Sequence, residues 1–170
     1  MTTTPATGGP SDSTIQDFAD MSAALTGFQS SFLRPFLDPT NLSETFYNFV
    51  VSQAGQPAMD DLLNAFRAIK TQPAQKIADT LLEVTTTPPS NQALLCQSII
   101  AMWYLGSWYP PANLLGTSLQ QVISSQAYTK SLVWNVAQAH PMGFSAFTFG
   151  YWSNPPASLD AFGVNTGGGK

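Results

Sequence analysis

His140 is the side chain of this sequence with the widest chemical repertoire, because imidazole acts as a base, a nucleophile or a metal ligand near neutral pH. It is the only histidine, and no Cys, Asp or Glu lies near it in the sequence. A metal site would therefore need three or four ligands drawn from distant positions. The His-Pro context favours a turn residue or an interface donor. A hydrolase that uses His140 is the least favoured alternative.

The single cysteine and the adjacent carboxylates have simple structural explanations. Cys96 is the only cysteine, so no internal disulfide can form. It lies within an apolar stretch, which favours a buried small hydrophobe over a reactive thiol. A disulfide from Cys96 to another chain stays open as an alternative. Asp60 and Asp61 begin a predicted helix, where the helix dipole accounts for acidic residues.

Glycine and serine motifs give no sign of a cofactor or a nucleophile. The segment NTGGGK at 165–170 would match a phosphate loop only with glycine in place of Val164, and no Ser or Thr follows Lys170. No G-x-G-x-x-G segment is present to hold a dinucleotide, and no serine has a G-x-S-x-G context. We therefore predict no catalytic, cofactor-binding or metal-binding residue in this chain.

Charge is scarce and unevenly distributed. Charged residues make up 9 % of the chain, against about 25 % in a typical protein. None lies between residues 84 and 129, where Trp and Tyr are frequent. An uncharged aromatic half is typical of the core of a protein interface, although Ser, Thr, Asn and Gln could also keep such a surface wet. The net charge of −4 without a basic cluster argues against nucleic acid as a partner.

The elements that position these residues are organised around the stretch at 93–109, ALLCQSIIAMWYLGSWY, which carries no charge. Its apolar residues occupy nearly all faces of a helix, which is typical of a helix buried in protein or in a membrane. Gln97 and Ser98 lie near its middle, and it is shorter than the roughly 20 residues of a membrane span. We therefore predict a central buried helix and no membrane span.

Apolar residues at helical spacing predict four helices before the central one. Their expected limits are an N-cap at Ser13 with a stop at Gly27, a cap at Asp38 or Thr40 with a stop at Gly55, a start after Pro57, and a start after Pro73 with Val84 facing inward. Pro35 and Pro39 predict a loop or short turns between the first two helices. Ser90 or Asn91 is expected to cap the central helix.

The pattern weakens after residue 111. One or two helices are expected in the segment at 113–138, the better one at about 124–136, and a short strand at 120–123 stays open as an alternative. Beyond His140 the sequence has Gly, Pro and aromatic residues without a period. The prediction is an all-α fold, a compact multi-helix domain at 13–140 around one apolar central helix. A flexible segment at 1–12 precedes it, and an irregular aromatic C-terminal arm and flexible tail at 141–170 follow it.

Three patches in order resemble one protein family. FADMSAALTGF with LDPTNLSETFY resembles its opening, IIAMWYLG resembles its central "I-x-x-A-W-Y-x-G" helix, and FGYWSNPP resembles its closing "G-x-W-x-x-x-P". Their order and spacing are similar to those of the small (gamma, escort) subunit of bacterial FAD-dependent sorbitol, fructose and glucose dehydrogenase complexes. The resemblance covers residues 18–156.

The resemblance implies a non-catalytic subunit that binds, matures and escorts a flavoprotein of the glucose–methanol–choline type. That catalytic partner holds the FAD and oxidises a sugar or polyol, and a cytochrome c subunit often takes the electrons. The small subunit holds no cofactor and is usually exported to the periplasm by a twin-arginine signal. The start MTTTPATGGPSDS has no such signal, so we expect either a periplasmic protein whose signal has been removed or a cytosolic one.

The sequence departs from the family after WYLG, where SWYPPANLLG replaces a glycine-rich turn, and at HPMGFSAFTFGYW, which lacks the cysteine of some relatives.

The alternative function is that of a stand-alone α-helical protein that binds a hydrophobic ligand or lies on a membrane surface. Aromatic residues are enriched among binding hot spots, so we expect an aromatic partner interface, with an arm folded back on its own central helix as the alternative. The residues of this expected partner interface are Trp108, Tyr109, Phe144, Phe147, Phe149, Tyr151 and Trp152.

Overall fold

A computed structural model of the chain describes residues 9–111, 114, 120–143, 153 and 155. This part is mostly helical, so the expected all-α fold is confirmed. The elements are, in order, α1 (Asp12–Thr26), α2 (Ser30–Leu33), α3 (Leu42–Ala54), α4 (Gln56–Ile69), α5 (Ala74–Leu81), α6 (Asn91–Leu105), β1 (Ser107–Trp108), β2 (Gln121–Val122), α7 (Ser125–Thr129) and α8 (Leu132–Val136). β1 and β2 form an antiparallel pair in which Ser107 is opposite Val122.

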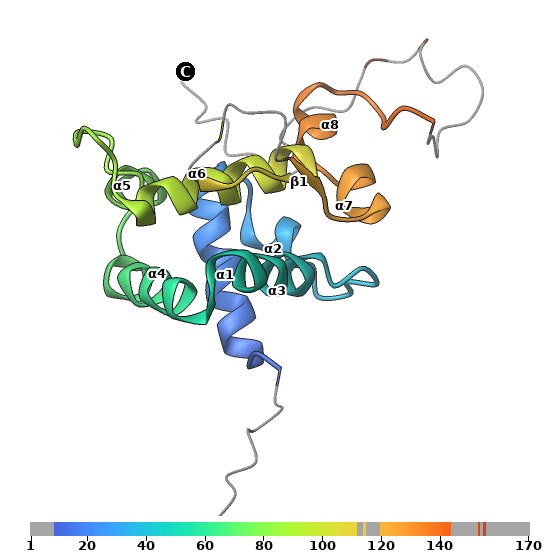
Figure 1. Ribbon diagram of the computed structural model, residues 1–170. Coiled ribbons are helices and arrows are strands. Elements are labelled where there is room, and N and C mark those ends of the chain that lie inside the picture. Colours follow the sequence, from blue (N-terminus) through green and yellow to red (C-terminus); the bar gives the residue numbers. More distant parts are fainter. Residues whose placement is uncertain (1–8, 112–113, 115–119, 144–152, 154, 156–170) are drawn as a thin grey trace, which may run out of the picture.

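Two helices, not one, organise the core. α1 contacts each of the helices α2 to α6, and α6 contacts α1, α3, α5, α7, α8 and β1. Figure 1 shows α6 lying across the C-terminal end of α1, with α3 and α4 crossing α1 below it. The Tyr104 hydroxyl of α6 donates to the Thr26 carbonyl of α1 at 2.9 Å. The expectation of a single central helix is therefore incomplete, because α1 has an equally central place.

The core is aromatic where α3 meets α6. Trp103 is 2 % exposed, and its ring packs edge-on against Phe46 with 4.7 Å between the ring centroids. Phe18 of α1 packs edge-on against Tyr47 of α3 at 5.8 Å. Such edge-to-face pairs add stability beyond the apolar area that they bury. The rings thus fix α1, α3 and α6 relative to one another.

Capping residues set most helix ends close to the expected positions. Ser90 caps α6 by accepting from the Ala93 amide, and Gly27 ends α1 in the left-handed conformation. The first cap is Ser11 and not Ser13, because the extended backbone of Ser11 lets its Oγ accept from the Thr14 amide at 3.2 Å. The helix therefore begins at Asp12, one residue before the predicted domain boundary.

The central helix is shorter than predicted. α6 ends at Leu105, because Gly106 adopts the left-handed conformation with φ +66° and its amide donates to the Met102 carbonyl. Residues 107–108 then form β1 in place of a further helical turn. The helix is also not buried all round, since Leu105 is 42 % exposed. Apolar sequence alone could not distinguish helix from strand at this point.

Two further expectations need correction. The helix expected at 124–136 is divided into α7 and α8, which meet at Lys130 and Ser131. Val84 does not face inward: it is 63 % exposed, because α5 ends at Leu81 and Glu83 turns the chain with a positive φ. The strand left open at 120–123 is present as β2.

Within the described residues, no helix is both long and apolar enough to cross a membrane. The longest apolar helix, α6, ends well short of the roughly 20 residues that a bilayer core requires.

Candidate partner-binding surface

The loop between α2 and α3 presents two large apolar side chains to solvent. Phe36 is 102 % exposed and Leu37 is 82 % exposed, more than any other large hydrophobic residue of the described chain except Met142. The sequence predicted only a loop here, since Phe36 and Leu37 lie between Pro35 and Pro39 without a helical period. Fully exposed neighbouring apolar side chains are uncommon unless they contact something. We call residues 34–40 the Phe36 loop.

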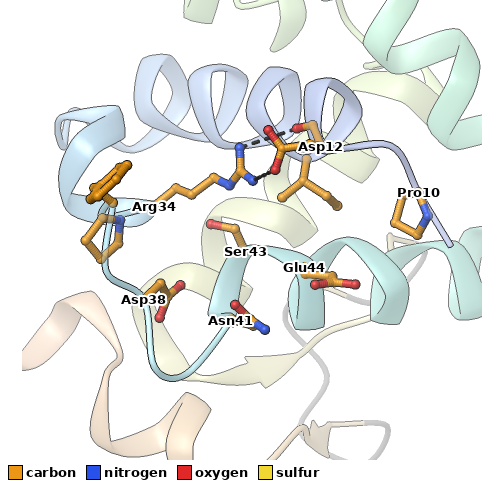
Figure 2. A pocket seen from close by; sticks show the side chains of 10 residues that line it. Pro10, Asp12, Arg34, Asp38, Asn41, Ser43 and Glu44 are labelled. Carbon is orange, nitrogen blue, oxygen red and sulfur yellow. Dashed lines mark hydrogen bonds and ion pairs between the residues drawn. The ribbon is translucent and has the colours of Figure 1, made fainter.

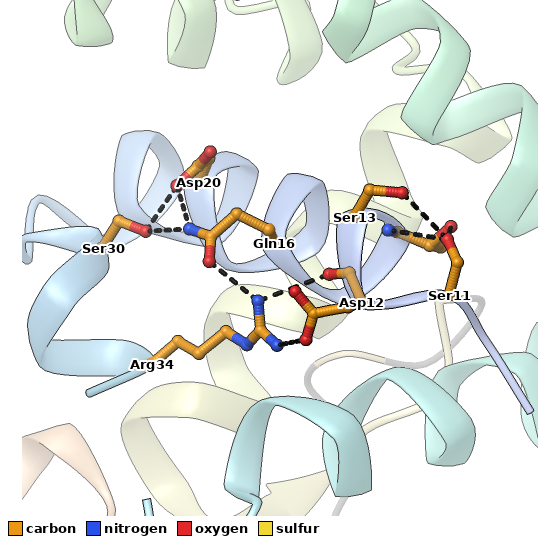
Figure 3. A network of polar contacts seen from close by, with 8 residues as sticks. Ser11, Asp12, Ser13, Gln16, Asp20, Ser30 and Arg34 are labelled. Atoms are coloured by element: carbon orange, nitrogen blue, oxygen red, sulfur yellow. Dashed lines mark hydrogen bonds and ion pairs between the residues drawn. The ribbon is translucent and has the colours of Figure 1, made fainter. Parts of the chain in front are cut away.

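The first end of this loop is tied to α1 by Arg34. Its guanidinium forms an ion pair with the Asp12 carboxylate and donates from Nη1 to the Gln16 side-chain oxygen at 2.8 Å. Figure 3 shows that Gln16 continues the network to Asp20 and Ser30 at the start of α2. The network fixes α2 and the entry of the loop against one face of α1.

The second end of the loop is fixed by Asp38. One of its carboxylate oxygens accepts from the Thr40 amide at 2.9 Å and from the Thr40 hydroxyl at 2.6 Å, and the other accepts from the Leu42 amide at 3.2 Å. The last bond satisfies an otherwise unpaired amide at the start of α3. Asp38 thus performs the capping role expected of it, although the N-cap position itself is Asn41 in the left-handed conformation.

A cleft lies directly beside the loop. It has a volume of about 340 Å³, and both Pro35 and Phe36 line it. Figure 2 shows Asp12 and Arg34 along one side of it, with Asp38, Asn41, Ser43 and Glu44 along the other. Three carboxylates and one guanidinium therefore surround the cleft, and the guanidinium is already paired with Asp12. The cleft has an excess of negative charge.

A second cleft, of about 480 Å³, lies between the starts of α1 and α4 and the middle of α3. Its lining is polar: Gln56 donates to the Tyr47 hydroxyl at 3.0 Å and to Asp60 at 2.8 Å. Arg67 at its edge is paired with Asp17. Neither of the two clefts has the mainly apolar lining expected of a site for a hydrophobic ligand.

Trp108, predicted for the partner interface, is a core residue. It is 1 % exposed, and its ring packs edge-on against Phe49 with 6.0 Å between the centroids. We therefore withdraw it from the expected interface: β1 turns inward after Gly106, which sequence alone did not indicate. Tyr109, the next residue, is half-buried. The remaining predicted interface residues lie outside the described residues; they are Phe144, Phe147, Phe149, Tyr151 and Trp152.

The residues considered for chemistry have structural places. The Nδ1 atom of His140 lies 3.1 Å from the Pro141 carbonyl oxygen. Cys96 is fully buried, and burial, together with the charge of Glu83, raises the pKa of its thiol to about 12. Such a thiol stays protonated and unreactive near neutral pH. Within the described residues, no three His, Cys, Asp or Glu side chains are grouped as metal ligands.

No protein-family model, curated protein or solved structure matches this chain.

Proposed function

We propose that this chain is the non-catalytic small subunit of an FAD-dependent sugar or alcohol dehydrogenase. In this proposal it binds, matures and escorts a catalytic flavoprotein of the glucose–methanol–choline type, in which the FAD resides. The sequence patches at residues 18–28, 37–47, 99–106 and 149–156 support the family, because they keep the order of the family motifs. A periplasmic location and a cytochrome c subunit belong to the same proposal.

The observation that carries the proposal is the apolar character of the exposed surface. Large hydrophobic side chains are exposed on several elements, namely Phe36, Leu37, Val84, Leu105, Val122, Tyr128, Val136 and Met142. A free monomer is kept soluble by a surface of mixed charges, whereas this chain has few charges and only Lys130 between residues 84 and 143. A surface of this composition is suited to contact with another protein.

Co-expression with a catalytic flavoprotein of the glucose–methanol–choline type tests the proposal. We expect the two proteins to elute together in size exclusion, and the flavin absorbance to follow the complex while this chain alone stays colourless. Separate elution of two soluble, stable proteins would contradict the proposal, and so would a flavin that remains with the isolated chain after dialysis.

The C-terminal segment provides a second test. A chain that ends at Gln138 keeps α1 to α8, so helical circular dichroism should be retained. If the aromatic residues beyond 140 contact the flavoprotein, this truncated chain should no longer co-elute with it. Co-elution that persists after truncation would move the interface onto the helical domain.

A further inference from the structure

The Phe36 loop combines full exposure with a fixed backbone. A flexible loop with two exposed apolar residues would collapse onto the nearest apolar surface, whereas this one is anchored at both ends by charged side chains. The tip of the loop is formed by Phe36 and Leu37. Before the tip, Arg34 is hydrogen-bonded to α1, and after the tip, Asp38 accepts three hydrogen bonds. Pro35 and Pro39 restrict the backbone on either side of the tip. The tip is therefore held away from the domain before any partner is present.

Such preorganisation favours association. An apolar anchor that is already ordered loses little conformational entropy when it enters a pocket, so more of its burial contributes to affinity. Phe is among the aromatic residues enriched in protein interfaces, and a side chain that fills a well-packed, desolvated pocket at the centre of a contact acts as an anchor. The tip of the loop has the form of such an anchor, and no other described segment presents two adjacent large hydrophobic side chains that are both more than 80 % exposed.

The adjacent cleft indicates the chemistry of the surface that meets the loop. Asp12 and Arg34 neutralise each other, which leaves Asp38 and Glu44 as uncompensated charges. The positive end of α3 offsets about half of one charge. The cleft thus favours a cationic side chain. Contact with a bilayer would bring the cleft close to anionic lipids, which repel its negative charge.

We propose that the Phe36 loop is the docking element for the catalytic subunit, with Phe36 and Leu37 entering an apolar socket on that subunit. A Lys or Arg at the rim of the socket enters the cleft between Asp38 and Glu44. This inference rests on the proposed function for the identity of the partner, and it specifies where the partner binds and what chemistry recognises it.

The test measures affinity for the purified flavoprotein subunit by biolayer interferometry. Phe36→Asp with Leu37→Asp should raise the Kd about 30-fold or more, as expected for the loss of hot-spot residues. Both side chains are exposed, so folding should be unaffected. Thr85→Asp with Thr86→Asp is the matched control, because both residues are exposed and the change adds the same two charges. They lie in the segment between α5 and α6, at the other side of the view in Figure 1. A Phe36 and Leu37 double variant that binds as tightly as the wild type overturns the inference while leaving the proposed function intact.

Two further variants test the hydrogen bonds that fix the loop and the negative charge of the adjacent cleft. Asp38→Ala keeps Phe36 and Leu37 but removes the bonds that fix the loop together with one charge of the cleft. At high salt, where the lost charge is screened, the Kd should still be about tenfold higher by loss of preorganisation. Glu44→Lys should weaken binding more at low salt than at high salt, because it would repel the cationic rim. Asp61→Lys on α4 makes the same change of charge elsewhere and should have no such effect. An unchanged Kd for Glu44→Lys overturns the cationic rim.

A wild-type chain that does not bind the flavoprotein contradicts the proposed function, and a second measurement then decides the inference. A photo-crosslinking phenylalanine analogue at position 36 is used in producing cells, with the same analogue at the exposed position 85 as the control. Two results together support the inference. The crosslinked peptide of the identified protein lies in an apolar pocket beside a Lys or Arg, and the Kd values of the variants for that purified protein follow the same order as predicted above. No adduct specific to position 36 overturns the inference. Binding to vesicles of phosphatidylcholine and phosphatidylglycerol (3:1) that depends on Phe36 and Leu37 also overturns it.

Discussion

α6 contacts two different kinds of structure. It packs on α1, α3 and α5, which are helices with a shared core, and Trp103 and Tyr104 near its C-terminus take part in these contacts. Towards its C-terminus it supports β1, β2, α7 and α8, which are short and add few residues to that core. The fully buried apolar residues of this second region are Trp108, Ala127 and Leu132. We call the first region the helical core and the second the C-terminal layer.

The difference shows how this chain divides stability between the two regions. A helix of five residues is too short to be stable in water by itself, so α7 and α8 depend on docking against α6. The helical core has caps, ion pairs such as Arg67 with Asp17, and a continuous set of buried aromatic residues. Damage to the helical core should therefore unfold the whole chain, whereas damage to the C-terminal layer should undock that layer alone.

The largest effect is expected from Trp103→Ala, which removes the ring that joins α6 to Phe46. Truncation of a buried large aromatic costs about 3–5 kcal/mol, and a domain is stable by only about 5–15 kcal/mol. Both regions should unfold together in one transition at a much lower Tm, measured by circular dichroism. Trp103→Phe keeps most of the ring and should lose far less. A Tm for the Ala variant equal to that of the wild type would mean that α6 does not join the two regions.

Gly106→Ala should damage the C-terminal layer selectively. A Cβ at this position would lie 2.5 Å from the Ala127 carbonyl oxygen of α7, and the φ of +66° strains any L side chain. Left-handed strain costs about 1–2 kcal/mol, and the displaced backbone raises the total to about 3 kcal/mol. Hydrogen exchange should show lost protection in α7 and β2, with α1 to α5 still protected.

Gly27→Ala is the matched control for this variant. Gly27 has a similar φ of +81°, but a Cβ there would meet nothing within 4 Å. It should therefore show only the strain of about 1–2 kcal/mol, spread over the helical core. Equal effects of the two substitutions would contradict the close packing of α7 on the end of α6.

Cys96 reports on the helical core alone. Its folded pKa of about 12 lies above the ordinary value of 9, so the folded state keeps the thiol proton where the unfolded chain loses it. The stability linked to this group is therefore complete below pH 9 and decreases as the pH rises from 9 towards 12. Thermal unfolding at pH 7.5 and pH 10 should show a larger loss of stability for the wild type than for Cys96→Ala.

The Cys96 thiol also tests whether the C-terminal layer can undock while the helical core stays folded. A thiol reagent at pH 7.5 should label Cys96 only when the helical core unfolds, and the slow labelling should persist in Gly106→Ala. Rapid labelling in that variant would mean that undocking of the C-terminal layer opens the helical core as well.

The smallest effect is expected at the turn that leads from α5 into α6. The Glu83 carboxylate accepts from the Ser90 amide at 3.0 Å, and this bond, with a further one from the Ser90 side chain, lowers the pKa of Glu83 below 4.5. Its contribution is thus present above pH 4.5 and is lost as the pH falls through the folded pKa. Glu83→Gln should lower the Tm slightly at pH 7 and not at pH 3. Asp61→Asn, which removes an exposed carboxylate of α4, is the control.

The sequence alone determined the helical core in most of its detail. A serine caps the start of α1 and of α6, and glycine ends α1, α3 and α6. The apolar residues of these helices recur at helical spacing, so local signals and the final structure agree. Cys96 was correctly expected to be buried, because it lies inside an uncharged apolar helix. The flavoprotein partner and the aromatic interface at 144–152 remain predictions.

Only the tertiary structure decided the C-terminal layer and the docking loop. In the segment WYLGSWY both helix and strand suit the apolar residues. The left-handed Gly106 ends α6, α7 packs closely against it, and Trp108 is buried in β1. Pro35 and Pro39 predicted a loop but not the direction of its tip. That direction follows from Arg34, which reaches Asp12 and Gln16 on α1, and from Asp38, which reaches the start of α3. The contacts of Arg34 join residues that are distant in sequence, and no local pattern encodes them. The Asp38 contact is local, and the sequence predicted Asp38 as a cap of the helix that follows.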